Sequence, residues 1–144
     1  MQASSITHAG DSYLGQAAGT GLPGHPSWTV SPSLVTGVAR AEFYIRANPG
    51  APHTTETLAR AAGLSARSLS RGFQQLRGYS PMAALRHARL ERVRLDLQKG
   101  TAGGTVTEAA VRWGFLHLGR FSNLYASRFG ELPSVTRRRA EEVV

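Results

Sequence analysis

The chain has 144 residues, a formal net charge of +8 from 17 basic and nine acidic side chains, and no cysteine. This length suits one compact domain, and the absence of cysteine excludes disulfides, thiolate metal sites and cysteine nucleophiles. No apolar run approaches the ~20 residues of a membrane span, and the start lacks the pattern of a secretory signal. The positive charge favours an anionic partner, with nucleic acid ahead of an acidic membrane surface, although a merely soluble basic surface would give the same charge balance.

Residues 1–33 differ in composition from the rest of the chain. Asp11 is the only charged residue among them, and about half of the residues are Gly, Pro, Ser or Thr. The segment has neither a helical nor a strand period, so we expect it to be disordered or loosely ordered.

Helical patterns begin at Leu34. Apolar residues then recur with helical spacing as far as Ile45, and Asn48-Pro49-Gly50 ends this first helix. Thr54 is a suitable N-cap for a second helix and Ser65 for a third, which Gly78 ends.

Ser80-Pro81 opens a fourth helix that runs to about Gln98, a length of roughly 27 Å. A glycine-rich loop, 100–104, precedes a capping-box pair, Thr105 and Glu108, which opens a fifth helix with Trp113 on its inward face. A sixth helix ends at Gly130, and a short seventh begins at Pro133. The expected fold is therefore all-α, with seven helices in a domain over 34–139 and a tail over 140–144.

Two segments follow one template: a small residue, a glycine four positions later, an apolar pair spaced by four, another glycine and a proline. The first copy is Ala59, Gly63, Leu69, Phe73, Gly78 and Pro81, and the second is Ala110, Gly114, Phe121, Tyr125, Gly130 and Pro133. The glycine breaks a helix in a tight turn, and the apolar pair holds the next helix across it. This is the pattern of a helix-turn-helix unit, although an ordinary αα-hairpin needs the same apolar positions. Two copies on a basic chain favour DNA binding.

The outward side chains of the third helix, 66–77, are of the kinds that hydrogen-bond base edges. No acidic residue, which would oppose phosphates, occurs from Ala61 through Leu90. The candidate DNA-contacting residues of this helix are Arg67, Ser68, Ser70, Arg71 and Gln74.

The sixth helix, 118–129, offers fewer such side chains. Its outward stripe is Arg120, Asn123 and Ser127. His117, at the start of the helix, could contact a phosphate, but we expect it first to cap the helix. Arg128 could pair with a phosphate or with Glu131. This helix is expected to contribute mainly phosphate affinity, leaving specificity to the third helix.

Over about residues 34–139, with the matching text in 58–97 and 106–134, the chain resembles the AraC/XylS family of bacterial transcription regulators. The second stretch resembles the family's signature region, which closes on Phe129, Gly130, Pro133 and Ser134 in the order Phe-Gly-x-x-Pro-Ser. The resemblance implies two helix-turn-helix subdomains joined by one long helix, with two recognition helices in successive major grooves. By position it implies that Arg67, Ser70 and Arg71 form the first base-reading set and that Arg120 and Asn123 form the second. It also implies a cytoplasmic, nucleoid-associated protein that binds double-stranded DNA and, as activators of the family do, RNA polymerase.

Full-length members of that family usually carry a separate effector-binding or dimerisation domain. Residues 1–33 are too few and too polar to form one, so we expect no small-molecule sensor domain in this chain. We also expect no cofactor, no metal and no membrane partner.

Other functional classes fit less well. The five histidines are scattered, and no catalytic triad, metalloprotease motif or phosphate-binding loop occurs, so we do not expect an enzyme. The main alternative is a truncated regulator that acts as a protein-interaction module or competes with a full-length homologue. A nonspecific DNA binder is a third interpretation.

Overall fold

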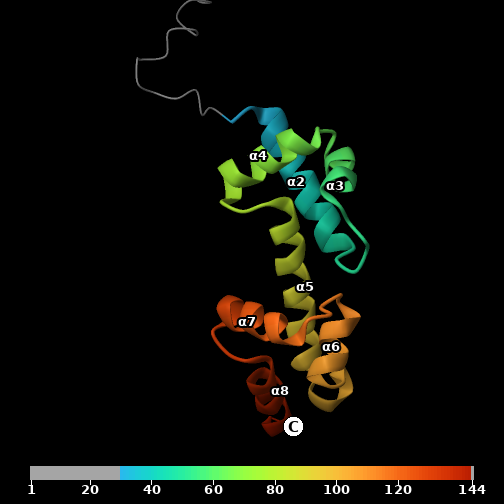
Figure 1. Cartoon of the computed structure of the whole chain (residues 1–144), viewed down its shortest axis with the longest axis vertical. Helices are drawn as coiled ribbons and strands as arrows, with labels where there is room; N and C mark the ends of the chain where they lie inside the picture. Colours follow the sequence, from blue (N-terminus) through green and yellow to red (C-terminus); the bar gives the residue numbers. More distant parts are fainter. Residues whose placement is uncertain (1–29, 144) are drawn as a thin grey trace, which may run out of the picture. The chain divides into compact units, whose positions relative to one another are not determined.

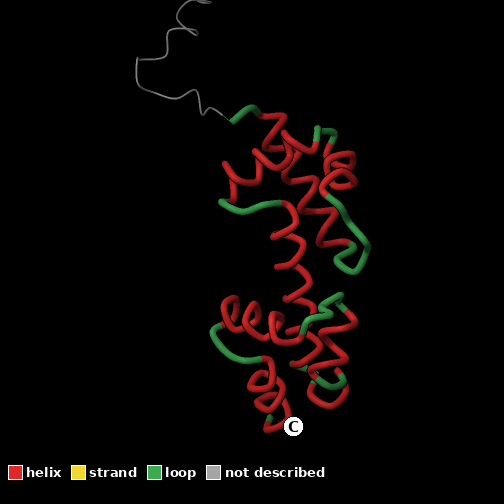
Figure 2. Tube along the Cα trace, in the orientation of Figure 1, coloured by secondary structure: helices red, strands yellow, loops and turns green. Residues whose placement is uncertain are grey.

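The computed structural model describes residues 30–143, and every regular element in that range is a helix (Figures 1 and 2). This confirms the all-α prediction and the order of the seven expected helices. The α-helices are α2 (Pro32–Ala47), α3 (Thr55–Ala62), α4 (Ala66–Arg77), α5 (Pro81–Leu97), α6 (Val106–Arg112), α7 (Leu118–Phe129) and α8 (Pro133–Glu142). The expected loop 100–104 contains a short 3-10 helix, η1 (Gly100–Gly103).

Helix α2 begins two residues before the expected Leu34. The Ser31 side chain accepts a hydrogen bond from the Leu34 backbone N–H, and proline at the first helical position has no N–H to satisfy. The helix buries Leu34, Val38, Ala41 and Ile45, the stripe that the spacing predicts. The segment expected to be loosely ordered lies outside the described residues, except for its last four positions.

Helices α3 and α4 form the first helix-turn-helix. Gly63 joins them with φ 71°, a left-handed conformation that favours glycine, and Gly78 ends α4 with φ 78°. Gly72 is the point where α4 crosses α2, because a Cβ at this position would lie 2.9 Å from side-chain carbons of Leu34 and Val38. The buried core of this unit is Val38, Ala41, Ile45, Leu58, Ala59, Ala62, Leu69, Phe73, Ala84 and Leu85.

The long helix α5 belongs to both units. Its first half contributes Ala84 and Leu85 to the first core, and its second half contributes Leu90, Val93 and Leu97 to a second core. One rigid element therefore joins the two helix-turn-helix units, as Figure 1 shows.

Helices α6 and α7 form the second helix-turn-helix. The capping box of Thr105 and Glu108 is present, Gly114 makes the turn with φ 90°, and Gly130 ends α7 with φ 73°. Trp113 is only partly buried and stands at the C-cap of α6, so Ala109 and Ala110 form the buried face of that helix. The buried core of this unit is Leu90, Val93, Leu97, Ala109, Ala110, Phe121 and Tyr125.

The expected tail is partly helical, because α8 continues through Ala140 to Glu142. Two pairs spaced by four residues support this last turn. Arg137 lies 3.1 Å from Glu141, and Arg138 lies 3.9 Å from Glu142.

Candidate nucleic-acid interface

Helix α4 is positioned by local capping and by its buried face. The Ser65 side chain accepts a hydrogen bond from the Ser68 backbone N–H at 3.1 Å, which satisfies one of the free donors of the first turn. Leu69, Gly72 and Phe73 face the core. The opposite face of α4 is consequently turned to solvent.

The predicted residues of α4 divide into exposed and partly buried positions. Arg67, Arg71 and Gln74 are exposed, and Ser70 is half-buried. Ser68 is also half-buried, and its hydroxyl oxygen accepts a 2.9 Å hydrogen bond from the Ser65 hydroxyl. Ser68 thus takes part in the cap, while the other four form the outward stripe.

The two stripe arginines remain available for a partner. Neither Arg67 nor Arg71 forms an ion pair with any described residue. Arg77 at the end of the same helix differs, because its guanidinium donates to both carboxylate oxygens of Glu42 at 2.6 and 2.9 Å. That hydrogen bond is the main reason why the pKa of Glu42 lies below its usual value. Arg77 therefore holds α4 to α2.

Helix α7 starts differently from α4. His117 occupies its N-cap position, but the side chain makes no capping hydrogen bond, so the expected capping role is wrong. The backbone of His117 is extended, and its ring is exposed beside the turn. Arg120, Asn123 and Ser127 are all exposed, as expected for an outward stripe.

Arg128 pairs with a residue that the sequence did not indicate. Its Nη2 lies 3.3 Å from Oε1 of Glu91 on α5, whereas Glu131 lies 2.9 Å from Arg139 and accepts a 2.6 Å bond from the Thr136 hydroxyl. The expected pair between Arg128 and Glu131 is therefore absent among residues 30–143. Arg128 ties the end of α7 to the long helix.

The ends of both candidate recognition helices meet one face of α5 at His87. The ring of Tyr79, just after α4, lies 5.0 Å from the His87 ring in an edge-on arrangement. Burial lowers the pKa of His87, and the positive charges of Arg128 and Arg86 lower it further. Tyr79 and Arg128 line one hollow together with His87, so both recognition helices end on this side of α5.

Arg89 ties the long helix α5 to the loop between α2 and α3, a contact that sequence reasoning missed. Its guanidinium donates to the backbone carbonyls of Pro49 and Ala51 at 2.8 and 2.9 Å, and burial lowers its pKa. An arginine on the apolar stripe between Leu85 and Val93 is the signal that could have indicated burial. Its acceptors lie in a loop about 40 positions earlier, and the sequence does not indicate them.

The second unit is braced by a buried carboxylate, Asp96, that the sequence analysis also missed. Its oxygens accept hydrogen bonds from Arg112 at 2.7 Å, from the Trp113 indole at 2.9 Å and from Lys99 at 3.2 Å. Burial would raise the pKa of Asp96, but these bonds outweigh it and hold the pKa below its usual value. This network fixes α6 against the end of α5.

The described residues offer little for other chemistry. No group of three or more His, Asp or Glu side chains among them could hold a metal ion. None of the described helices is both long and apolar enough to cross a membrane.

Comparisons with known proteins agree with this architecture. A family described as "Helix-turn-helix domain" matches residues 58–139. A crystal structure of a probable AraC family transcriptional regulator from Rhodopseudomonas palustris superposes with a TM-score of 0.69 at 43% identity, covering 72% of this chain and 96% of that one. An AraC-type structure from Chromobacterium violaceum gives a TM-score of 0.66 at 28% identity, covering 72% and 91%.

Curated relatives are regulators of operons. The probable thc operon regulatory protein of Rhodococcus erythropolis is 43% identical over 104 residues, which cover 72% of this chain and 31% of that protein. The XylDLEGF operon transcriptional activator 2 of Pseudomonas putida is 44% identical over 98 residues, covering 67% and 62%. The chain therefore spans less than two thirds of the length of these relatives.

Proposed function

The chain belongs to the AraC/XylS family of helix-turn-helix proteins, and from this membership we propose that it is a sequence-specific DNA-binding regulator of transcription. Helices α4 and α7 enter successive major grooves on one face of the duplex. Successive grooves lie roughly 34 Å apart. The 17 residues of α5 span about 25 Å, a length suited to hold two recognition helices over such a site.

The observation that carries this proposal is the outward stripe of α4. Arg67 and Arg71 are exposed and have no ionic partner among the described residues, and Gln74 is exposed on the same stripe. Arginine pairs with guanine and glutamine with adenine through two hydrogen bonds each. Together with Ser70, these side chains read one half-site.

The second half-site is read more weakly. Asn123 is the exposed side chain of α7 best suited to contact a base edge, while His117, Arg120 and Ser127 supply contacts to the backbone. The Ser68 hydroxyl accepts a hydrogen bond from Ser65 in the α4 cap and donates its own proton to a phosphate next to the first half-site.

We further infer that the protein acts in the cytoplasm on the nucleoid and works by binding, without catalysis. The names of the Pseudomonas putida relatives support activation as the direction of regulation. An activator of this kind contacts RNA polymerase as well as double-stranded DNA.

The experiment is selection of sites from a random duplex pool, followed by affinity measurements on the selected duplex. A bipartite motif with half-sites about one helical turn apart supports the proposal. Replacing Arg71 by alanine should cost about 1–3 kcal/mol and relax base preference in one half-site only. An equal loss on every duplex would contradict the assignment of Arg71.

The matched control is Arg60→Ala. Arg60 is an exposed arginine of α3 and lies outside the stripe, so its loss should leave the base preference of both half-sites unchanged. Enrichment of no motif, with binding that still falls steeply with salt, would indicate a nonspecific DNA binder. No DNA binding at all would favour a protein-interaction module.

A further inference from the structure

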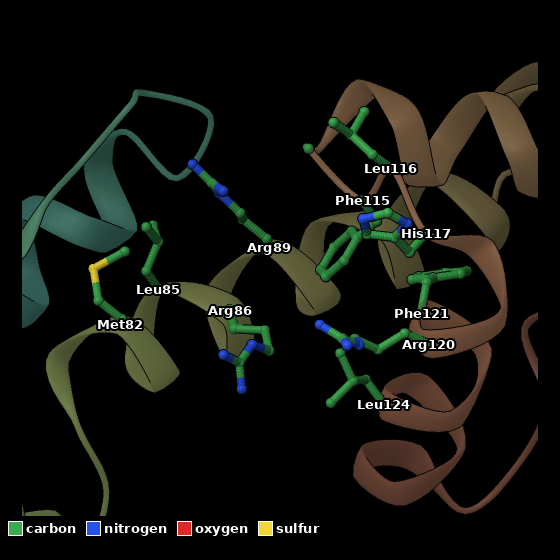
Figure 3. Close-up of a pocket in the computed structure, with 11 residues that line it drawn as sticks. Met82, Leu85, Arg86, Arg89, Phe115, Leu116, His117, Arg120, Phe121 and Leu124 are labelled. Carbon is green, nitrogen blue, oxygen red and sulfur yellow. The ribbon is translucent and has the colours of Figure 1, made fainter.

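A hollow of about 420 Å³ lies between the long helix α5 and the start of α7 (Figure 3). Met82, Leu85, Arg86 and Arg89 line it from α5. The turn from Gly114 to His117 and the first residues of α7, including Arg120, line its other side. The hollow therefore occupies the space between the two helix-turn-helix units.

The lining is positively charged and contains no carboxylate. Arg86 and Arg120 are exposed, and neither pairs with an acidic side chain of residues 30–143. In Figure 3 Arg120 extends from α7 toward Arg86, whereas Arg89 extends toward the loop whose carbonyls it binds. Two guanidinium groups thus converge on one space without a counter-charge from the described part of the chain.

A second hollow, on another side of α5, shows that a lining without carboxylates is not a general property of the helix. That hollow, of about 340 Å³, is lined by Glu42 and Glu91 together with Arg46, Arg92 and Arg128. Glu42 is bound by Arg77, and Glu91 by Arg128. The carboxylates there neutralise neighbouring arginines, while the hollow beside Arg86 keeps its charge.

The position of the basic hollow specifies the anion. Arg86 also lies next to Leu124 and Ser127 of α7. It is adjacent to His87, which lines one hollow with Tyr79, just after α4, and Arg128, at the end of α7. A duplex that places two successive major grooves over α4 and α7 must place the intervening minor groove over the middle of α5. In that arrangement the phosphates that border this minor groove would be the negative groups nearest to Arg86.

We propose that Arg86 and Arg120 each bind a backbone phosphate of the DNA between the two half-sites. This inference rests on the proposed function and adds a third anchoring point to it. The contact carries no base information, because phosphates are the same at every step. It fixes the register of the duplex against the long helix and adds affinity on any sequence.

The test is Arg86→Ala in the full chain, with affinity measured over a range of salt concentrations. One lost phosphate contact should reduce the log-log salt slope by about 0.9. Affinity should fall by the same factor on the selected duplex and on an unrelated duplex, and base preference should stay unchanged in both half-sites. An unaltered slope, or a changed base preference at any position, would overturn the proposal.

Arg92→Ala is the matched control. Arg92 is an exposed arginine of the same helix, about 120° further round from Arg86, and it lines the other hollow. Arg92→Ala removes the same charge and should leave the salt slope unaltered. An equal change of slope in Arg86→Ala and Arg92→Ala would indicate a general charge effect and would also overturn the proposal.

Arg120→Ala supplies a second, independent measurement. It should reduce the slope as Arg86→Ala does, and a loss confined to one base pair would show that Arg120 reads a base instead. If the wild-type chain selects a bipartite motif while both variants keep its salt slope, the phosphate site fails and the proposed function stands. If the wild type binds no DNA, the phosphate site and the proposed function both fail.

Discussion

The two helix-turn-helix units share a framework and differ on their outward faces. An offset of 52 residues places Phe121 on Leu69, Tyr125 on Phe73 and Gly130 on Gly78. At the same offset Gly119 stands where α4 has Arg67, Asn123 stands where it has Arg71, and Ala126 stands where it has Gln74. The positions that build the core stay apolar, while those suited to base contact become smaller or less basic.

The units are also held in different ways. The first buries mainly aliphatic side chains around Phe73. The second packs aromatic rings in sequence from Phe115 through Phe121 and Tyr125, and it adds the hydrogen-bond network of Asp96. The aromatic packing and the hydrogen bonds of Asp96 hold the second unit firmly to α5, and under our proposal the first unit carries most of the sequence preference.

The largest effect on this comparison is expected at Trp113. It aligns with the small, buried Ala62 at an offset of 51 residues, which also relates Ala110 to Ala59 and Gly114 to Gly63 and is one less than the offset between α4 and α7. Trp113→Ala removes the indole that packs on the second core and donates a hydrogen bond to Asp96. The same ring lies close to Gly50, where an added Cβ would be 3.5 Å from it. We expect a loss of about 3 kcal/mol in the free energy of unfolding, measured by chemical denaturation. A stability equal to that of the wild type would show that the network does not brace this unit.

A smaller contrast is expected at the two N-caps. Ser65 caps α4 with its side chain, whereas His117 makes no such bond on α7. Ser65→Ala should cost about 1 kcal/mol of stability, while His117→Ala should cost much less. Thermal melting of the two variants checks this, and an equal destabilisation would contradict the difference between the caps.

The smallest effect concerns pH. Burial holds the pKa of His87 below its ordinary value, so the unfolded chain takes up a proton at this residue at a higher pH than the folded chain does. Stability should therefore fall as pH decreases from the ordinary pKa of histidine toward the lowered one. Replacing His87 by glutamine should flatten this dependence in denaturation curves at several pH values; an unchanged dependence would assign it to another group.

The sequence predicted the framework well because helix ends and apolar stripes are local signals. Helix ends can be recognised from the residue type and its nearest neighbours in the sequence. This holds for the N-caps Thr54, Ser65 and Thr105, though not for Ser31, and for the left-handed glycines Gly63, Gly78, Gly114 and Gly130. The periodic apolar positions likewise identify the buried face of each helix.

The contacts between distant segments could not be predicted in the same way. The carbonyl acceptors of Arg89 and the carboxylate partner of Arg77 lie 35 or more positions away. Glu131, one of the two partners considered for Arg128, is near in sequence, whereas Glu91, which Arg128 contacts, is near only in space. Within the candidate site, exposure followed from the helical period, but the convergence of Arg86 and Arg120 depends on how α7 packs against α5.

The most direct test of the account is a scan of every single-base substitution in the selected duplex, with affinities measured at one fixed salt concentration. Arg71→Ala identifies the half-site bound by α4, because the base preference in that half-site is the one that this variant relaxes. The account predicts larger losses per substituted base pair in that half-site than in the half-site bound by α7. Equal losses in both half-sites, or larger losses under α7, would contradict it.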